Sequence, residues 1–161
     1  MKLNLGSGYD YRKGWVNVEQ IKSIKADVRH NLDIYPYPFK DDSIEEIRLS
    51  NILEHLSEPI RALQECVRIA SNDCILTLIV PHARGSSAFG DLQHKNFFTD
   101  KTFTPLLLEE YGLTELKLES IKFISSGNIN HWKNYVPFRR QLSLFISGLY
   151  DEIEFIFKIK K

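Results

Sequence analysis

The run CILTLIV at residues 74–80 restricts the fold of this chain more than any other segment. Its apolar residues stand on consecutive positions instead of alternate ones, as expected of a strand covered on both faces. Shorter strand-like runs precede it, at residues 2–5, 15–19, 26–30 and 44–50. Because such runs alternate with helix-like segments, the sequence predicts an α/β fold with a doubly wound, mostly parallel, Rossmann-like sheet.

Residues 57–70 form the clearest helical segment. Ser57 is the expected N-cap, and Pro59 falls in the first turn, where its missing N–H is harmless. A second helix is expected over about 101–111, with its end at Gly112. Helical spacing puts one apolar stripe on the first of these helices, made of Ile60, Leu63, Val67 and Ala70.

The chain after Gly112 predicts a further strand, a helix and a closing strand. The strand falls within 114–125, and the helix lies around 137–149. In the closing run, 151–160, apolar and polar residues alternate, which is typical of a half-buried strand. A closing strand reached through a helix commonly pairs antiparallel at one edge of a mixed sheet, so we expect that position here.

The chain has 161 residues and a formal net charge of zero. This length suits one domain over residues 1–161, and the balanced charge argues against a nucleic-acid-binding protein. No stretch reaches the roughly 20 apolar residues that span a membrane, and no signal peptide is recognisable. Cys66 and Cys74 stand among apolar neighbours and are expected to be buried free thiols, which fits a cytoplasmic protein.

Glycine and polar residues stand where the predicted strands end, and in an open α/β sheet the ligand crevice lies beyond these ends. Gly6-Ser7-Gly8 follows the first strand and would let a ligand approach the backbone, although an ordinary tight turn is the plain alternative. Glu19 ends the second strand, where it is either a solvated surface residue or a carboxylate that accepts ribose hydroxyl protons. A dinucleotide site would need glycine where Tyr11 stands, so NAD fits poorly.

An ordered series of segments resembles the class I S-adenosylmethionine-dependent methyltransferases, most closely the small "methyltransferase type 11" group. The resemblance covers roughly residues 2–111 and implies S-adenosylmethionine as the cofactor. The segments are LNLGSG, GWVNVE, ADVRHNLDIYPYPFKDDSIEEIRLSNILEHL, ALQECVRIA and a strand that ends in Pro81. The cofactor-binding residues that the resemblance implies are Gly6, Ser7, Gly8, Glu19, Asn31, Leu32, Ser50 and Asn51.

The resemblance also implies a role for each part of this set. The glycine turn would approach the methionine part of the cofactor, with Ser7 contributing its N–H, and Glu19 would hold the ribose. Asn31 stands where the group usually has Asp beside the adenine amino group, and its amide oxygen can still accept that hydrogen bond. Leu32 would line the adenine ring, and Ser50-Asn51 would lie near the sulfonium methyl.

Two features depart from the family. Asn4 replaces an acid that many members carry, and only residues 6–15 separate the first two strands. A helical crossover needs about 10–12 residues at least, so a minimal fold with a shortened first crossover is expected. One face of the sheet would then be thinly covered, which a homodimer or another partner could compensate.

The segment FGDLQHKNFFTDKTF at residues 89–103 resembles a stretch that follows the fifth strand in this group. His94 is the candidate general base, and Asp91, three residues earlier, would fix its tautomer. Phe97 and Phe98 could close over the acceptor. The alternative is that His94 only packs, and His55 is interpreted as structural. No metal site is expected, because His30, His82 and His131 show no ligand spacing.

The implied activity is methyl transfer from S-adenosylmethionine to a small acceptor, such as a hydroxyl or amine of a sugar or other metabolite. Asn4, Asn31 and the missing first helix leave open a non-catalytic S-adenosylmethionine-binding module or a degenerate partner subunit. A different reaction of the same cofactor is also left open.

Overall fold

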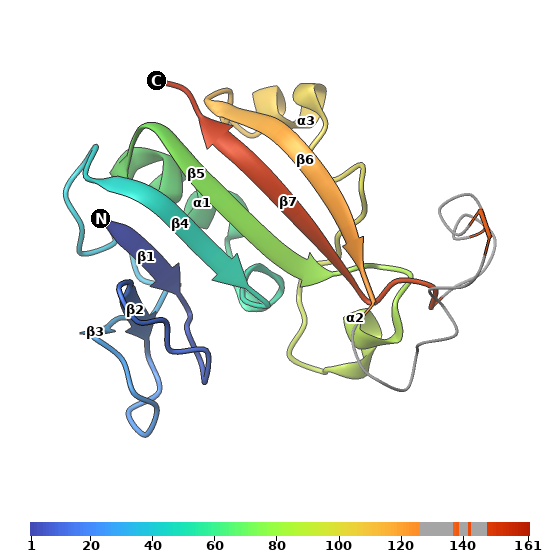
Figure 1. Ribbon diagram of the computed structural model, residues 1–161, viewed down its shortest axis with the longest axis horizontal. Helices are drawn as coiled ribbons and strands as arrows, with labels where there is room; N and C mark the ends of the chain where they lie inside the picture. Colours follow the sequence, from blue (N-terminus) through green and yellow to red (C-terminus); the bar gives the residue numbers. More distant parts are fainter. Residues whose placement is uncertain (126–136, 139–141, 143–147) are drawn as a thin grey trace.

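A computed structural model describes residues 1–125, 137–138, 142 and 148–161. These residues form a seven-stranded sheet in the order β3-β2-β1-β4-β5-β7-β6 (Figure 1). Strands β1 to β5 are parallel, and β7 runs antiparallel to both of its neighbours, which confirms the predicted mixed sheet. The strands are β1 (Lys2–Leu5), β2 (Val16–Glu19), β3 (Val28–Arg29), β4 (Ile44–Ser50), β5 (Ala70–Pro81), β6 (Leu116–Ile124) and β7 (Glu152–Ile159).

The closing strand β7 is antiparallel as predicted, but it does not lie at the edge of the sheet. It inserts between β5 and β6, so β6 is the edge strand and the predicted edge position is wrong. The burial of the two strands explains this order. In β7 every second side chain is buried, whereas β6 is exposed along most of its length and carries charged residues such as Lys117 and Lys122. Charged, exposed side chains are typical of an edge strand.

Helix α1 (Pro59–Ile69) lies within the predicted segment. Its N-cap is Glu58 and not Ser57, because the Ser57 hydroxyl donates to Asp33 and accepts from Lys95. The predicted apolar stripe is shifted around the helix. Ile60 is partly exposed, and the buried side chains are Ala62, Leu63, Cys66, Val67 and Ile69.

Helix α3 (Pro105–Glu110) is shorter than the predicted helix over 101–111, because residues 101–103 form a turn. Its end agrees with the prediction. Gly112 adopts a left-handed conformation with φ +65°, and its N–H donates to the Glu109 carbonyl. The Leu113 N–H donates to the Leu108 carbonyl, which completes a Schellman motif. The predicted helix over 137–149 falls mostly outside the described residues and stays a prediction.

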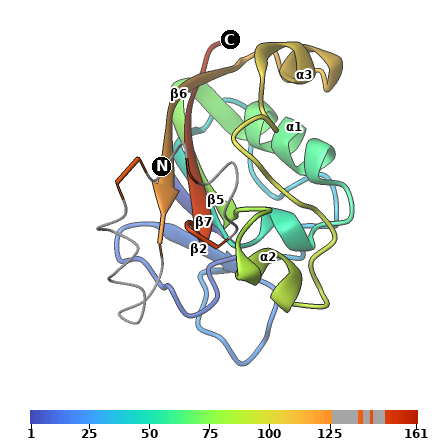
Figure 2. The same ribbon diagram turned by 90° about the vertical axis from the view of Figure 1, so that its right-hand side faces the viewer.

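All three described α-helices lie on one side of the sheet (Figure 2). They are α1, α3 and the short α2 (Ser86–Gly90), and a 3₁₀ turn η1 (Leu53–His55) follows β4. The core between sheet and helices includes buried side chains from β1, β4, β5, β7 and α1. Cys66 and Cys74 are buried free thiols, as predicted, and burial raises the pKa of both. Within the described part of the chain, no helix has the length and apolar character needed to cross a membrane.

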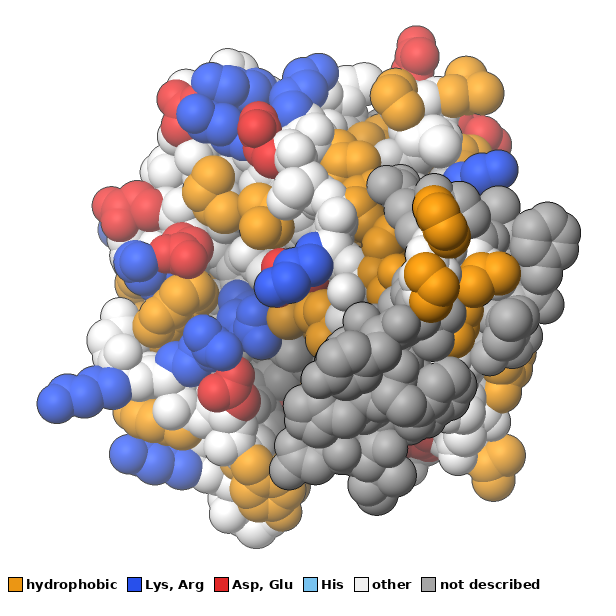
Figure 3. Space-filling view, turned by 45° about the vertical axis from the view of Figure 1, so that its right-hand side comes forward, with side chains coloured by type: hydrophobic (Ala, Val, Ile, Leu, Met, Phe, Trp, Pro, Cys, Tyr) orange, Lys and Arg blue, Asp and Glu red, His pale blue; other side chains and the backbone are white. Residues whose placement is uncertain are grey.

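No described helix covers the opposite face of the sheet, where residues 6–15 form a loop instead of a helix. This face is mixed in character and not uniformly apolar, as Figure 3 shows to the left of the grey residues. Lys2 pairs with Glu46 across β1 and β4, and Arg48, Thr77 and Ile156 lie in register across β4, β5 and β7. The charged side chains show how a sheet face without a helix can meet water.

Buried side-chain amides hold the short first crossover in place. Asn17 accepts a hydrogen bond from the Arg12 N–H at 2.8 Å, and its Nδ2 donates to the Arg12 and Trp15 carbonyls. Asn4, which is buried, donates from Nδ2 to the Asp10 carbonyl at 2.7 Å and to Asn17 Oδ1 at 3.1 Å. A carboxylate at position 4 could not donate these bonds. The departure at Asn4 therefore accompanies the helix-free crossover.

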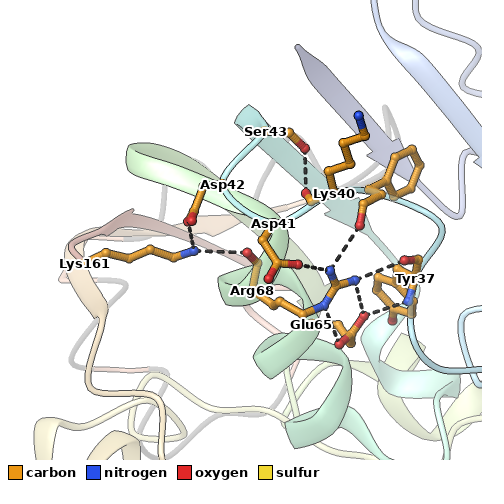
Figure 4. Close-up of polar contacts among 9 residues, drawn as sticks. Tyr37, Lys40, Asp41, Asp42, Ser43, Glu65, Arg68 and Lys161 are labelled. Carbon is orange, nitrogen blue, oxygen red and sulfur yellow. Dashed lines mark hydrogen bonds and ion pairs between the residues drawn. The ribbon is translucent and has the colours of Figure 1, made fainter.

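The long loop between β3 and β4 is attached to α1 through Arg68 (Figure 4). Its guanidinium donates to both carboxylate oxygens of Glu65 and to the carbonyls of Tyr37 and Phe39. The Glu65 carboxylate also accepts from the Tyr37 N–H, and its pKa is lowered, chiefly by the hydrogen bond from Arg68. This network fixes the far end of the loop, whose near end carries Asn31 and Leu32.

Candidate functional site

A cavity of about 570 Å³ opens at the carboxyl ends of β1, β2 and β4. The sequence predicted eight cofactor-binding residues, and all eight line this cavity together with residues such as Asn4, Ile52, His55 and Gln93. They come from four separate segments that the parallel strands bring to one edge. These residues are Gly6, Ser7, Gly8, Glu19, Asn31, Leu32, Ser50 and Asn51.

The two glycines of the first turn are needed for different reasons. Both have positive φ, +64° at Gly6 and +50° at Gly8, which favours glycine at either position. A Cβ on Gly6 would lie 2.3 Å from Ile52 Cδ1, so Gly6 is required by packing inside the protein. A Cβ on Gly8 would meet no atom of the described residues within 4 Å. Gly8 therefore leaves open space beside the backbone on the cavity wall.

Ser7 lines the cavity, but its N–H is already used inside the protein. The N–H donates to the Val18 carbonyl at 2.9 Å, so the predicted contribution of this group to a ligand does not fit the structure. The Oγ atom is buried and has no hydrogen-bond partner among the residues that the structure describes. A buried hydroxyl without a partner is costly, and a ligand in the cavity could supply the partner.

Glu19 is buried at the end of β2 and holds two loops together. Its Oε2 accepts from the Gly8 N–H at 2.9 Å, and its Oε1 accepts from the N–H groups of Gln20 and Ile21. A carboxylate has about four lone-pair sites, so Oε2 retains room for one further donor. Glu19 thus shapes the glycine turn and can still accept one hydroxyl proton. The plain alternative of a solvated surface glutamate is excluded.

The other two segments provide a polar and an apolar wall. Asn31 Oδ1 accepts from the Asp33 N–H at 3.0 Å, and Leu32 beside it is buried. Asn51 has φ +54° and donates from Nδ2 to Glu152 Oε1 at 2.8 Å. This bond ties the end of β4 to the start of β7.

The predicted base, His94, lies beside the cavity and not on its lining. Its Nδ1 is 2.9 Å from the Ala88 carbonyl, so that carbonyl sets the tautomer and leaves Nε2 with a free lone pair. Asp91 does not form the expected orienting hydrogen bond, because its Oδ2 is 3.9 Å from Nε2, the other ring nitrogen. Gln93 and His55 line the cavity instead. The ring of His55 lies 4.7 Å from that of His94 and nearly perpendicular to it.

Glu54 is a residue to which the sequence assigns no role. Its side chain is 1% exposed, and neither carboxylate oxygen has a hydrogen-bond partner within the described residues. Burial raises the pKa of this carboxyl to about 7, an effect that its own backbone N–H and then the nearby His94 partly offset. The hint in the sequence was LEHL at 53–56, which follows a strand tip and places an acid beside a histidine.

The sequence predicted no metal site, on the spacing of His30, His82 and His131. His30 and His82 belong to no cluster of possible metal ligands in the described part of the chain, and His131 lies outside it. The structure brings together another set, in which Glu54, His55 and His94 place possible ligand atoms within 4.8 Å of one another. Residues 55 and 94 are far apart in sequence, so spacing alone could not show this.

The two phenylalanines of the 89–103 segment have different environments. Phe98 is buried and packs against Phe103 in the core, so it cannot close over an acceptor. Phe97 is 47% exposed and stacks on the exposed ring of Phe89. Only Phe97 remains available for the predicted role.

Comparisons with known proteins place the chain by its structure. No family model and no curated protein matches the sequence. A SAM-dependent methyltransferase from Archaeoglobus fulgidus has a TM-score of 0.71 at 16% identity, over 98% of this chain and 85% of that one. A chain in the complex of the Haloferax volcanii Trm112 methyltransferase activator has a TM-score of 0.66 at 12% identity, over 99% and 82%. The [4+2]-cyclase SpnF has a TM-score of 0.62 at 14% identity, over 99% and 74%. The chain therefore has the class I S-adenosylmethionine-dependent methyltransferase fold.

Proposed function

We propose that this protein binds S-adenosylmethionine in the cavity and transfers its methyl group to a small acceptor. One observation carries the proposal. The eight residues that the resemblance implies as cofactor-binding all line one cavity at the carboxyl ends of the parallel strands. The similarity to a solved methyltransferase over nearly the whole chain supports the same reading of the fold.

The cavity residues fit this cofactor. The open space at Gly8 would admit the methionine part close to the backbone, and the unpartnered Ser7 hydroxyl would bond its polar atoms. Glu19 would accept one ribose hydroxyl proton on Oε2, while Asn31 and Leu32 would contact the adenine. When bound, S-adenosylmethionine supplies an electrophilic methyl group on a sulfonium. The role of the chain is to align the acceptor with that methyl and to exclude water.

An acceptor hydroxyl or amine must also lose a proton. We keep His94 in that role, with Nε2 as the accepting atom and Ala88 holding the ring. Asp91, 3.9 Å from Nε2, would stabilise the imidazolium that forms, so its contribution is charge and not tautomer control. His55 is the member of the pair that lines the cavity, and the acceptor would lie on its side. The zero net charge favours a small metabolite, with a sugar hydroxyl as the first candidate acceptor.

A homodimer remains part of the proposal. A methyltransferase activator occurs in the complex that supplies one structural neighbour, which illustrates a partner subunit in that other protein. In the present chain, the helix-free sheet face is the surface that a second copy would cover. Light scattering should give twice the monomer mass. A monomer at high concentration would remove the homodimer from the proposal and leave the cofactor assignment untouched.

Calorimetry and product release test the function. S-adenosylhomocysteine should bind with one site per chain, and NAD should give no heat. Incubation with S-adenosylmethionine and pooled sugar or amine acceptors should then release S-adenosylhomocysteine. Binding without release from any pool would support the alternative, a non-catalytic binding module or a degenerate subunit. Heat from NAD alone would overturn the cofactor assignment.

A further inference from the structure

Three side chains that could bind a metal lie close together at the cavity. His55 lines the cavity, whereas Glu54 and His94 lie beside it. Glu54 and His55 belong to η1, and His94 belongs to the segment after α2. One possible ligand atom from each lies within 4.8 Å of the others. Two imidazoles and one carboxylate form a donor set that occurs in catalytic zinc sites, where three protein ligands leave a fourth position open.

Glu54 is the observation that points to a ligand. Its carboxylate is almost completely buried, and neither oxygen has a hydrogen-bond partner among the described residues. The other buried glutamate of this region, Glu19, accepts three backbone N–H bonds. Burying a carboxylate without a partner is costly, and buried charges in proteins are usually paired or coordinate a metal. A cation between Glu54 and the two histidines would supply the missing partner.

His94 already has the orientation of a metal ligand. Its Nδ1 donates to the Ala88 carbonyl at 2.9 Å, which leaves the lone pair of Nε2 free. A histidine that binds a metal usually donates its other ring N–H to a carbonyl or carboxylate in this way. Asp91 Oδ2 lies 3.9 Å from the same Nε2 and adds a second negative charge nearby.

The segment that carries His94 is fixed to η1 by its backbone. The N–H groups of Lys95 and Asn96 both donate to the Glu54 carbonyl, at 2.8 and 3.1 Å. The Asn96 side chain donates to the carbonyls of Leu53 and Leu56, at 3.2 and 2.7 Å. The two backbone segments that carry the three ligands are therefore held together by hydrogen bonds that do not use the ligand side chains. Such support is what a precise site requires.

We propose that Glu54, His55 and His94 bind one divalent transition-metal ion, with zinc as the best match. Imidazole nitrogen suits zinc, copper, nickel and iron, whereas magnesium and calcium prefer oxygen ligands only. Zinc holds its ligand atoms at about 2.0–2.2 Å, which places tetrahedral ligands about 3.3–3.5 Å apart. The side chains need to close by less than about 1.5 Å from the present limit of 4.8 Å. The inference goes beyond methyl transfer and does not depend on it, because these side chains could hold a metal without cofactor. With the metal bound, His94 Nε2 is a ligand and no longer the proton acceptor proposed above, whereas the cofactor-binding residues are unaffected.

The test uses the full chain, stripped with a chelator and free of S-adenosylmethionine. Zinc binding is measured by calorimetry, and Co²⁺ is added separately because its visible absorption reports the ligand geometry. We expect one zinc per chain and a tetrahedral Co²⁺ spectrum. Glu54→Gln, which keeps the size of the side chain, is the main variant, and His55→Ala and His94→Ala complete the set. His30→Ala is the matched control, because His30 also lines the cavity but belongs to no ligand cluster among the residues that the structure describes.

Each cluster variant should weaken zinc binding by more than about 100-fold, because loss of a mere supporting residue already costs about 10–100-fold. His30→Ala should bind zinc as the parent does. Circular dichroism of each metal-free variant shows whether it is folded, and Glu54→Gln, which removes an uncompensated buried charge, provides the decisive comparison. Absence of stoichiometric zinc binding by the parent, or unchanged binding by folded Glu54→Gln, would overturn the proposal. A parent that binds S-adenosylhomocysteine but no zinc would refute the metal site and leave the proposed function standing.

Discussion

Alanine at Gly8 should separate the stability of the glycine turn from its ligand binding. Gly8 has φ +50°, and a Cβ there would meet nothing within 4 Å in the described part of the chain. Gly14 is the matched control, with φ +84°, the same open surroundings and a position away from the cavity lining. An alanine in the left-handed region costs roughly 1–2 kcal/mol, so Gly8→Ala and Gly14→Ala should lower the free energy of unfolding by similar amounts.

Binding should distinguish the two variants. The new methyl group of Gly8→Ala would stand in the space that the cofactor is proposed to enter. If it prevents two hydrogen bonds of about 1 kcal/mol each, the dissociation constant for S-adenosylhomocysteine rises by about 30-fold. Gly14→Ala should bind like the parent. Urea denaturation measures the first quantity and calorimetry the second.

Gly6→Ala provides a contrasting case within the same turn. Its Cβ would lie 2.3 Å from Ile52 Cδ1 and 2.4 Å from Ile52 Cγ1, so overpacking adds about 1–3 kcal/mol to the backbone cost. The double variant with Ile52→Ala should recover part of the overpacking cost.

Parental affinity in a stable Gly8→Ala protein would refute the placement of the cofactor over this turn. Equal losses of affinity in Gly8→Ala and Gly14→Ala would mean that general loosening, not contact, weakens binding.

Three further predictions concern buried polar groups. Glu19→Gln should lower the free energy of unfolding by about 1–3 kcal/mol even without ligand, because the amide NH₂ must face a backbone donor; urea denaturation without a stability loss would contradict this role. Arg68→Lys should cost about 1–3 kcal/mol in the same assay, since lysine cannot bond both Glu65 oxygens and two carbonyls at once, and a neutral result would show that the network adds no stability. His82, whose Nδ1 accepts from the Arg84 N–H, has its pKa lowered by burial, so the unfolded chain binds its proton first. The stability of the parent relative to His82→Asn should therefore be constant above about pH 6.5 and fall below it, and parallel pH profiles would exclude this titration.

The order of elements could be predicted because each strand carries its own local pattern. The start of β5 shows where that approach ends. The strand begins at Ala70, but Ser71, Asn72 and Asp73 look like a turn in the sequence, and Asp73 has φ +67°. The register between β4 and β5 shifts at this point, from Ile44 opposite Ala70 to Glu46 opposite Ile75. The polar residues thus form a bulge inside a strand, which depends on the neighbouring strand and cannot be predicted from local composition.

The position of β7 was unpredictable for a related reason. Its alternating pattern fixes which side chains face the helices, but the pattern is the same at the edge and one strand inside it. The choice depends on whether β6 pairs with the side of β7 that faces away from β5, and only the register from Leu116 opposite Ile159 to Ile124 opposite Glu152 shows that it does. Sequence pattern therefore constrains the faces of a strand more strongly than its neighbours.

Part of the candidate site could likewise be predicted from the sequence, and part could not. Gly6, Gly8 and Glu19 could be found because strand tips of a parallel sheet converge by topology, whatever the loops between them do. Glu54 could not, because its importance lies in having no partner, and that depends on the segment carrying His94 being bound through Asn96 to the carbonyls of η1. An isolated Glu-His pair in a sequence suggests a solvated acid beside a structural imidazole. Burial by a distant segment turns the same pair into a candidate metal site. The position of the proposed cofactor-binding residues therefore follows from the fold, whereas the surroundings of Glu54 depend on the one loop that carries His94.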